Sequence, residues 1–189
     1  MQGKIIIFSA PSGSGKSTII NNLIPDKSLC LGFSVSATSR APRGEEKHGK
    51  DYYFLSDSEF KKKVNDGEFV EWEEVYPGTC YGTLESEVKR ITEQGFNLVL
   101  DVDVKGALNI KKKFGDKAVT ILIMPPSKEA LEERLRKRAT DSKSTIEKRL
   151  MKSEFEMSFA PEFDHVIIND NLDAAVHKTR EVITSFIYK

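Results

Sequence analysis

A glycine-rich segment near the start of the sequence has the composition of a phosphate-binding loop. It reads Ala10-Pro11-Ser12-Gly13-Ser14-Gly15-Lys16-Ser17-Thr18, directly after the apolar run Lys4–Ser9 and before the helical pattern of residues 19–23. Its two glycines allow the backbone to turn N–H groups inward around phosphate oxygens, and a helix start adds positive partial charge at the same point. The sequence therefore predicts a P-loop for a nucleoside triphosphate.

Side chains of this loop have distinct expected tasks. Lys16 is expected to reach the β- and γ-phosphates, and the Ser17 hydroxyl to bind a Mg²⁺ ion that bridges them. Thr18 is expected to pack at the helix start. Ala10 stands where the general motif has glycine, and a turn that only joins strand to helix is the alternative interpretation. The loop alone leaves kinase, GTPase and motor open.

Two arginines three positions apart, Arg40 and Arg43, lie in a loop that also contains proline and glycine. The planar guanidinium group donates paired hydrogen bonds to phosphate oxygens and keeps its charge at any pH. The pair could therefore hold one phosphate dianion, and Tyr52 and Tyr81, each beside a turn signal, could add neutral hydroxyl donors. A solvent-exposed charged loop would account equally well for the two arginines.

A strand with alternating side chains is predicted over residues 69–75. Alternation is expected to place Phe69, Glu71 and Glu73 on one face, opposite Val70 and Trp72. An exposed strand carboxylate among other acidic residues is the simplest interpretation of Glu71.

The same carboxylate could recognise guanine. Glu71 could accept hydrogen bonds from guanine N1–H and N2–H₂, whereas adenine has no donor at N1. Hydroxyl groups of Ser36 and Thr83 could donate to guanine O6. A site that relies on such bonds rejects analogues that leave its buried polar groups unpaired. These residues form a second candidate nucleotide site.

The framework that must position these residues is predicted to be an α/β fold. Short apolar runs alternate with segments of helical period, and we find no internal repeat. Five runs are expected to form the central strands: Lys4–Ser9, Leu31–Ser36, Asn97–Val102, Val119–Met124 and His165–Ile168. Their continuous hydrophobicity is typical of a parallel sheet with helices on both faces.

Helix boundaries are also indicated. The segments Ser56-Asp57-Ser58-Glu59 and Ser144-Thr145-Ile146-Glu147 have the pattern of capping boxes. A helix from about Leu84 is expected to end at Gly95, and another to begin near Ser127, after Pro125-Pro126. The last helix is expected to begin with Asp170 or Asn171 as its cap and to reach Tyr188.

Two segments are expected to leave this framework. Residues 36–90 contain shorter alternating pieces, and residues 134–152 are rich in arginine and lysine and have no strand pattern. We therefore expect one domain, with a core of about residues 1–35, 91–133 and 153–189 and two excursions.

The bulk properties exclude several classes of protein. The 189 residues suit one compact domain, and no stretch approaches the roughly 20 apolar residues of a membrane helix. Lysine plus arginine equals aspartate plus glutamate at 29 each, so no global positive field would attract long nucleic acid. Cys30 and Cys80 have neither metal-ligand spacing nor disulfide density. With no secretory signal at the N-terminus, we expect a cytoplasmic location.

Taken together, the motifs resemble those of guanylate kinases over essentially the whole chain. The matching segments are Ser9–Ser17, Ser36–Arg43, Gly49–Tyr52, Glu68–Trp72, Tyr81–Thr83, Leu100–Gly106 and Ile168–Asp170. Alanine commonly opens the P-loop of bacterial members, in agreement with Ala10. The resemblance implies the central sheet of a P-loop NTPase, a small mixed GMP-binding subdomain at about residues 36–90 and a helical lid at about 134–152.

The resemblance also implies roles for individual residues. ATP would be bound by the loop residues Ala10 to Thr18 and by Asn169, and the GMP phosphate by Arg40, Arg43, Tyr52 and Tyr81. Guanine would be read by Ser36, Glu71, Thr83 and Asp103. Asp101 would lie near the metal ion and phosphates, directly or through water; a carboxylate that caps the next helix is the alternative. Arg134, Arg138 and Arg149 match lid arginines that close over the triphosphate, with a basic helix surface as the alternative.

The implied reaction is transfer of the γ-phosphoryl group of Mg·ATP to GMP, and dGMP is an expected second acceptor. We expect no membrane or nucleic-acid partner, and a homo-oligomer is compatible with the sequence. Two departures from the family pattern are Thr83, where serine is common, and Ala139, where many members have glycine. The first keeps the hydroxyl, and the second could alter lid flexibility.

Two alternatives remain at this point. One is a related kinase for AMP, CMP or UMP. The other is a scaffold module with the same fold that binds proteins and does no chemistry; such modules lack a working P-loop.

Overall fold

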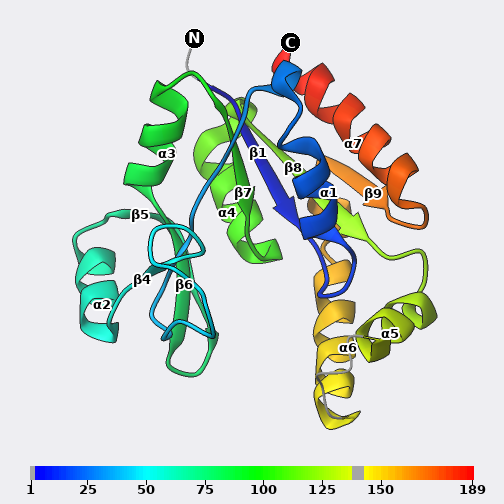
Figure 1. The fold of residues 1–189 in the computed structure, drawn as a ribbon, viewed down its shortest axis with the longest axis horizontal. Coiled ribbons are helices and arrows are strands. Elements are labelled where there is room, and N and C mark those ends of the chain that lie inside the picture. Colours follow the sequence, from blue (N-terminus) through cyan, green and yellow to red (C-terminus); the bar gives the residue numbers. More distant parts are fainter. Residues whose placement is uncertain (1–2, 138–142) are drawn as a thin grey trace. The chain divides into compact units, whose positions relative to one another are not determined.

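The computed structural model of the chain describes residues 3–137 and 143–189 (Figure 1). The described helices and strands follow one another as β1 (Ile5–Ser9), α1 (Lys16–Leu23), β2 (Leu31–Phe33), β3 (Ala37–Thr38), β4 (Tyr53–Phe54), α2 (Asp57–Asn65), β5 (Phe69–Tyr76), β6 (Thr79–Leu84), α3 (Glu85–Glu93), β7 (Asn97–Asp101), α4 (Val104–Phe114), β8 (Ala118–Met124), α5 (Lys128–Lys137), α6 (Lys143–Met157), β9 (His165–Ile168) and α7 (Leu172–Ile187). Short 3-10 helices are η1 (Lys27–Leu29), η2 (Gly115–Lys117) and η3 (Ala160–Glu162).

The central sheet contains the five predicted strands in the order β2-β7-β1-β8-β9, which confirms the α/β prediction. Strands β1 and β8 pair in parallel from Ile5 opposite Ala118, and β8 pairs in parallel with β9. Strand β2 is shorter than predicted: it ends at Phe33, not Ser36, because the chain there leaves this sheet to enter a second one at β3.

The two faces of the central sheet are covered by different helices. Ile6 and Phe8 of β1 pack with apolar residues of α1 and α7 in one buried cluster. Successive side chains of a strand point to opposite faces, and α4 contacts β1 and β8 on the other side. Full burial of each large apolar side chain stabilises the fold by about 1.5–3 kcal/mol. This packing fixes the carboxyl ends of the strands, where the P-loop begins.

Most predicted helix boundaries are confirmed. Ser56 and Glu59 form a reciprocal capping box at α2, and Asn171 caps α7. Helix α3 ends just before Gly95, which has a φ of 82°. The predicted capping box at Ser144 is wrong, because Ser144 already has helical backbone within α6, which is described from Lys143. Polar residues are tolerated throughout a first turn, so the pattern fixes the start only to within a residue or two.

The second sheet is mixed, with the order β4-β3-β6-β5, and β3 pairs in parallel with β4 but antiparallel with β6. Strand β5 spans Phe69–Tyr76 and pairs antiparallel with β6. Phe69 opposes Leu84 and Glu71 opposes Thr83, so two steps on β5 match one on β6, which is a β-bulge.

The bulge corrects the predicted strand faces. Phe69 stacks on Phe60 of α2 at 4.6 Å between ring centroids, and Trp72 contacts the same ring edge-on, so Phe69 shares its face with Trp72. Thr83 follows Gly82 and precedes Leu84, which packs with Phe69 in the α2 core. Glu71 and Thr83 therefore lie on the opposite face of the sheet. We call this the polar face, defined by Glu71, Glu73, Tyr81 and Thr83.

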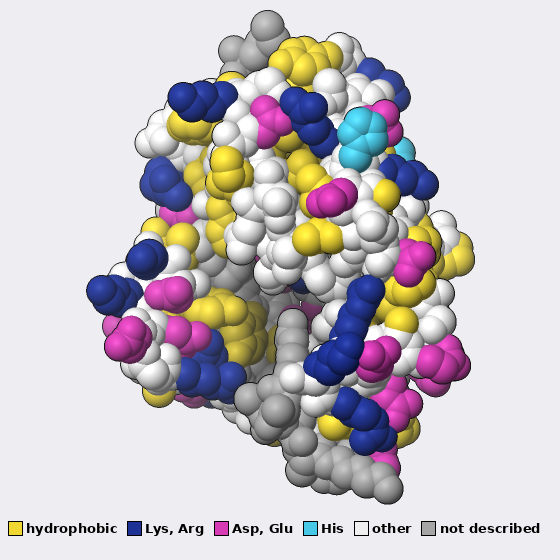
Figure 2. Space-filling model, turned by 45° about the vertical axis from the view of Figure 1, so that its right-hand side comes forward, with side chains coloured by type: hydrophobic (Ala, Val, Ile, Leu, Met, Phe, Trp, Pro, Cys, Tyr) yellow, Lys and Arg dark blue, Asp and Glu magenta, His cyan; other side chains and the backbone are white. Residues whose placement is uncertain are grey.

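The chain divides into two compact units. The core unit comprises Ile5–Leu31 and Val99–Lys189; the small-sheet unit comprises the residues up to Lys4 and Gly32–Leu98. On the face drawn in Figure 2, basic and acidic side chains are interspersed rather than gathered by sign. Within the described residues, no helix combines the length and apolar character needed to cross a bilayer.

Candidate functional site

The P-loop of the core unit connects β1 to α1 through two left-handed glycines. Gly13 and Gly15 have φ values of 96° and 90°, a region that L-residues with a Cβ rarely adopt. A Cβ on Gly15 would also lie 2.3 Å from the side-chain nitrogen of Asn169. Gly15 occupies the N-cap of α1 without a side-chain hydrogen bond to the first turn. The first N–H groups of α1 are therefore not capped by a side chain and can serve a phosphate.

Lys16 is the first residue of α1, and its ammonium group pairs with the carboxylate of Asp101 at the end of β7. Both side chains are mostly buried, with 18% and 29% exposure. The pair brings together the two charged residues that the sequence assigned to the phosphates and the metal ion. Ser17 and Thr18 are exposed, so the expected packing of Thr18 at the helix start is wrong.

Asn169, after β9, is bound to the P-loop. Its side-chain nitrogen donates to the carbonyl oxygen of Ser14 at 2.7 Å, and its backbone N–H donates to Met124 at 2.7 Å. Its own carbonyl accepts a 2.9 Å hydrogen bond from Arg134 of α5. Asn169 thus restrains the loop through Ser14, a role that no local sequence pattern indicates because the two partners are 155 positions apart.

The predicted lid residues lie partly inside the described chain. Helices α5 and α6 pack through Leu131, Leu135 and Ile146. A Cβ on Gly13 would lie 3.1 Å from side-chain carbons of both Leu131 and Leu135, so α5 packs closely against the P-loop. Arg149 lies on α6 and is partly buried. Arg138 and Ala139 lie outside the described residues.

The core unit offers hard oxygen donors that suit Mg²⁺. Ser17 supplies a hydroxyl on the first turn of α1, and Asp101 supplies a carboxylate. Among the described residues, no group of three or more His, Cys, Asp or Glu side chains could hold a metal ion. Mg²⁺ commonly takes only one or two protein oxygens and completes its shell with water and substrate phosphates. Ser17 and Asp101 fit that pattern.

Asp103, assigned to guanine, belongs to the core unit, where it caps α4. One of its carboxylate oxygens accepts from the N–H of Gly106 at 2.7 Å. A carboxylate that caps the next helix was the alternative interpretation of Asp101, but the residue that caps α4 is Asp103.

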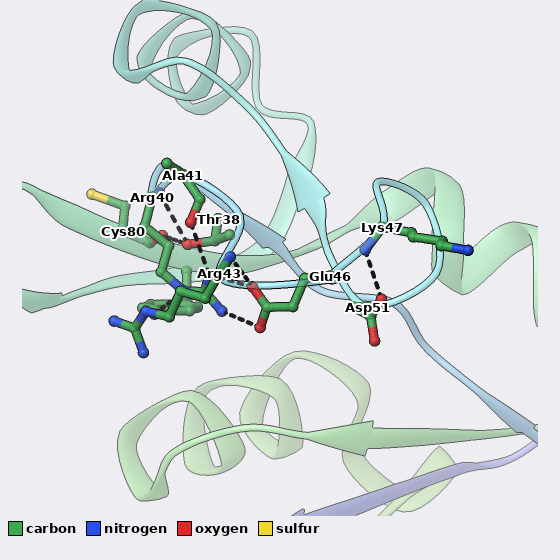
Figure 3. Close-up of polar contacts among 9 residues, drawn as sticks. Thr38, Arg40, Ala41, Arg43, Glu46, Lys47, Asp51 and Cys80 are labelled. Carbon is green, nitrogen blue, oxygen red and sulfur yellow. Dashed lines mark hydrogen bonds and ion pairs between the residues drawn. The ribbon is translucent and has the colours of Figure 1, made fainter. Parts of the chain in front are cut away.

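In the small-sheet unit, Arg40 is already paired with a carboxylate. Its guanidinium donates to both Glu46 oxygens, at 2.7 and 2.8 Å, and the backbone N–H of Arg43 donates to one of them at 2.8 Å. Figure 3 shows the Arg40 guanidinium turned toward Glu46, whereas that of Arg43 points away. Arg43 is exposed, so the structure leaves its side chain at the surface of the loop. Glu46 was not among the predicted site residues, although an acid three positions after the second arginine was a usable signal.

Two tyrosines complete this cluster. The Nε–H of Arg40 donates to the Tyr81 hydroxyl at 3.1 Å, and the guanidinium carbon lies 5.0 Å from the centroid of the Tyr52 ring. The Tyr52 and Tyr81 rings meet edge-to-face at 5.9 Å. A hydroxyl that accepts from arginine still has its own proton to donate. Three of the four residues predicted to hold the acceptor phosphate therefore lie together, and Arg43 joins them through its backbone.

On the polar face, Thr83 donates a 2.9 Å hydrogen bond to a carboxylate oxygen of Glu71. Thr83 is fully buried, and a Cβ on Gly82 would lie 2.7 Å from the carbonyl oxygen of Glu71, so β5 and β6 approach closely here. Ser36, just before β3, accepts a 2.9 Å bond at its carbonyl from the Tyr53 N–H. The sheet thus positions these three predicted guanine residues within one unit.

Titration of Glu46 offers a direct test of the arginine cluster. Hydrogen bonds from Arg40 and from the Arg43 N–H lower the pKa of Glu46 from 4.5 to about 2. Because the folded pKa is depressed, the pairing contributes stability above pH 4.5 and loses it as the pH falls toward 2. Carboxyl-carbon NMR should place the Glu46 midpoint near the lower value, and Arg40→Met should move it back toward the upper one. A wild-type midpoint already at the upper value would show that the pair is absent in solution.

The chain is similar to guanylate kinases along its length. The family's sequence profile, described as guanylate kinase, matches residues 2–186. The guanylate kinase of Bacteroides thetaiotaomicron is 54% identical over 189 residues, which cover 100% of this chain and 92% of that protein. The guanylate kinase of Porphyromonas gingivalis is 54% identical over 186 residues, covering 98% and 99%.

A solved structure agrees with the sequence relatives. The crystal structure of guanylate kinase from Anaplasma phagocytophilum superimposes with a TM-score of 0.76 at 31% identity, covering 100% of this chain and 88% of that one. The profile match and the level of identity, together with the P-loop and the mixed second sheet, lead to one conclusion: this chain belongs to the guanylate kinase family.

Proposed function

We propose that this protein transfers the γ-phosphoryl group of ATP to the phosphate of GMP and releases ADP and GDP. The observation that carries the proposal is the P-loop, with two left-handed glycines, an uncapped helix start and Lys16 held by Asp101. A scaffold module would have no use for this arrangement. The family assignment supplies the identity of the acceptor.

The core unit would bind the ATP phosphates. N–H groups of the loop and of the first turn of α1 would donate to phosphate oxygens, and Lys16 would reach the β- and γ-phosphates. Asp101 keeps the lysine ammonium at the end of β7 before the nucleotide arrives. Asn169 restrains the loop through Ser14, so less backbone entropy is lost when ATP binds.

Mg²⁺ would be held by the Ser17 hydroxyl and by Asp101, directly or through water. When bound, the ion offsets the negative charge of the phosphates. Arg134 and Arg149 would add positive charge near the transferring group, as would Arg138. Arg134 is anchored by the carbonyl oxygen of Asn169, which links it to the same loop.

The small-sheet unit would hold the acceptor phosphate. Arg40, Tyr81 and Tyr52 form one contact cluster, and Arg43 joins it at the loop. Glu46 holds Arg40 in a fixed geometry and offsets its charge until a phosphate competes for the guanidinium. The acceptor oxygen of a nucleoside monophosphate is ionised near neutral pH, so no protein general base is required.

Guanine would be read on the polar face. The Glu71 carboxylate, which accepts from Thr83, would also accept from guanine N1–H and N2–H₂. Thr83 now donates to Glu71, so its predicted donation to guanine O6 requires that this bond be exchanged. Ser36 would offer a second hydroxyl, and Asp103, in the core unit, a further acceptor.

A panel of monophosphates tests the proposal. A coupled assay of ADP release with AMP, GMP, CMP and UMP is expected to show rapid turnover with GMP alone. Equal rates with AMP would reject the guanine assignment, and no stimulation by any monophosphate would favour the scaffold alternative. Three further predictions stay open to test. The same assay can check whether dGMP is accepted, size-exclusion chromatography can check self-association, and cell fractionation can check the cytoplasmic location.

A further inference from the structure

Glu87 of α3 is a buried, heavily hydrogen-bonded carboxylate that the proposed mechanism does not use. It is 2% exposed and accepts from three separate segments of the small-sheet unit. Arg90 donates to its two oxygens at 2.8 and 3.0 Å, the Val35 backbone N–H at 3.0 Å and the Tyr53 hydroxyl at 2.9 Å. A buried carboxylate is costly unless it is paired and hydrogen-bonded, and here each oxygen accepts two bonds.

The bond to Val35 stabilises a segment that belongs to neither sheet. The chain leaves β2 at Phe33 and enters β3 at Ala37. A backbone N–H in this connection has no strand partner and needs another acceptor when it is shielded from water. Glu87 supplies that acceptor directly before Ser36, one of the predicted guanine residues.

The bond to Tyr53 anchors a second part of the predicted site. The Tyr53 ring packs against the small-sheet core, and its hydroxyl donates a hydrogen bond to the Glu87 carboxylate. Its backbone N–H donates to the Ser36 carbonyl, so β4 and the connection are held by one network. Tyr52, directly before it, contacts Arg40 and Tyr81 at the predicted phosphate end.

We propose that Glu87 is a positioning residue for the monophosphate acceptor, which holds Ser36 and Tyr52 at a fixed separation through the residues adjacent to each. The inference rests on the proposed function, because it assigns a role within that site. Glu87 itself does not contact the nucleotide, since its carboxylate is buried and its oxygens are engaged. It acts through Val35 and Tyr53.

The charge of Glu87 matters for this role. Burial alone would raise its pKa, but hydrogen bonds from Arg90, Val35 and Tyr53 outweigh it and lower the pKa below the ordinary value. The group is therefore ionised at neutral pH. Glutamine at this position would turn an N–H₂ group toward donors and leave at least one of them unpaired.

Steady-state kinetics of Glu87→Gln and Tyr53→Phe test the role. For Glu87→Gln we expect the KM for GMP to rise about 10-fold, because an unpaired buried donor displaces the connection. For Tyr53→Phe, which loses one hydrogen bond and keeps the ring, we expect a rise of about 3-fold. The KM for ATP should stay within about 2-fold of wild type in both, since the P-loop lies in the other unit.

Glu93→Gln is the matched control, because Glu93 is exposed at the end of the same helix. If Glu87 has only a structural role, Glu87→Gln will have a lower melting temperature, but the KM for GMP will be unchanged in both Glu87→Gln and Tyr53→Phe. That result would overturn the proposal. If Glu87→Gln does not fold, Tyr53→Phe decides alone. A wild-type enzyme without GMP-dependent turnover would overturn the proposed function as well, whereas wild-type turnover with unchanged KM values rejects only the role of Glu87.

Discussion

Replacement of Lys16 by alanine is expected to lower kcat for GMP phosphorylation by about 10²- to 10³-fold, the effect of removing one preorganised charge from a transition state. Lys16 is the first residue of α1, directly after the left-handed Gly15, and its ammonium pairs with the carboxylate of Asp101. Mostly buried charges interact more strongly than charges in water. A coupled ADP-release assay at saturating ATP and GMP measures the change.

The fold is expected to survive this substitution. Without Lys16 the carboxylate of Asp101 loses its partner, but its side chain is 29% exposed and can be hydrated. Lys112→Ala, at an exposed position of α4, is the control for the loss of a lysine. Turnover of Lys16→Ala near that of wild type, with an unchanged circular dichroism spectrum, would remove Lys16 from the catalytic machinery.

Replacement of Glu71 by glutamine is expected to lower kcat/KM for GMP by about 10- to 100-fold, since hydrogen bonds to a charged group are worth about 1.5–3 kcal/mol. Glutamine keeps an oxygen that can accept from Thr83, so the contact between β5 and β6 is retained. It replaces the second oxygen by an N–H₂ group, which opposes the donors at guanine N1 and N2. Kinetics with GMP and AMP measure both the loss and the change in selectivity.

Glu74→Gln is the matched control on the same strand, because Glu74 is exposed and its carboxylate accepts from the Gly78 N–H in the turn that follows. This variant should keep the wild-type preference for GMP over AMP. If Glu71→Gln keeps it too, guanine is read by other residues and the assignment of Glu71 fails.

Sequence patterns predicted the elements whose signals are local. The strands around Ile5–Ser9 and His165–Ile168 are continuous apolar runs, and the P-loop is one contiguous motif. The end of β2 was predicted three residues late, because Ser34–Ser36 keeps a strand-like composition while its backbone bonds go to Glu87 and Tyr53. The bulge in β5 was missed because it depends on which residues of β6 oppose it.

In the candidate site, too, single residues could be predicted from local patterns, but contacts between distant residues could not. Arg40 and Tyr81 are 41 positions apart, and Ser14 and Asn169 are 155 apart, so no local spacing could reveal either hydrogen bond. Residue type alone indicated Arg40 as a phosphate ligand, since guanidinium chemistry is specific. It did not indicate that Glu46 occupies that guanidinium in the free protein, because pairing depends on how the loop folds back.

The bulge between Phe69 and Glu71 has a consequence for how this family can change over time. The face on which Glu71 lies is set by its pairing with Thr83, while Val70 is the extra residue that has no partner of its own on β6. Many substitutions at Val70 should therefore be neutral, and deletion of that single residue would restore one-to-one pairing from Phe69 to Glu71 and leave the carboxylate on the polar face. Aligned sequences should vary freely in the residue at this position and should also tolerate a gap there.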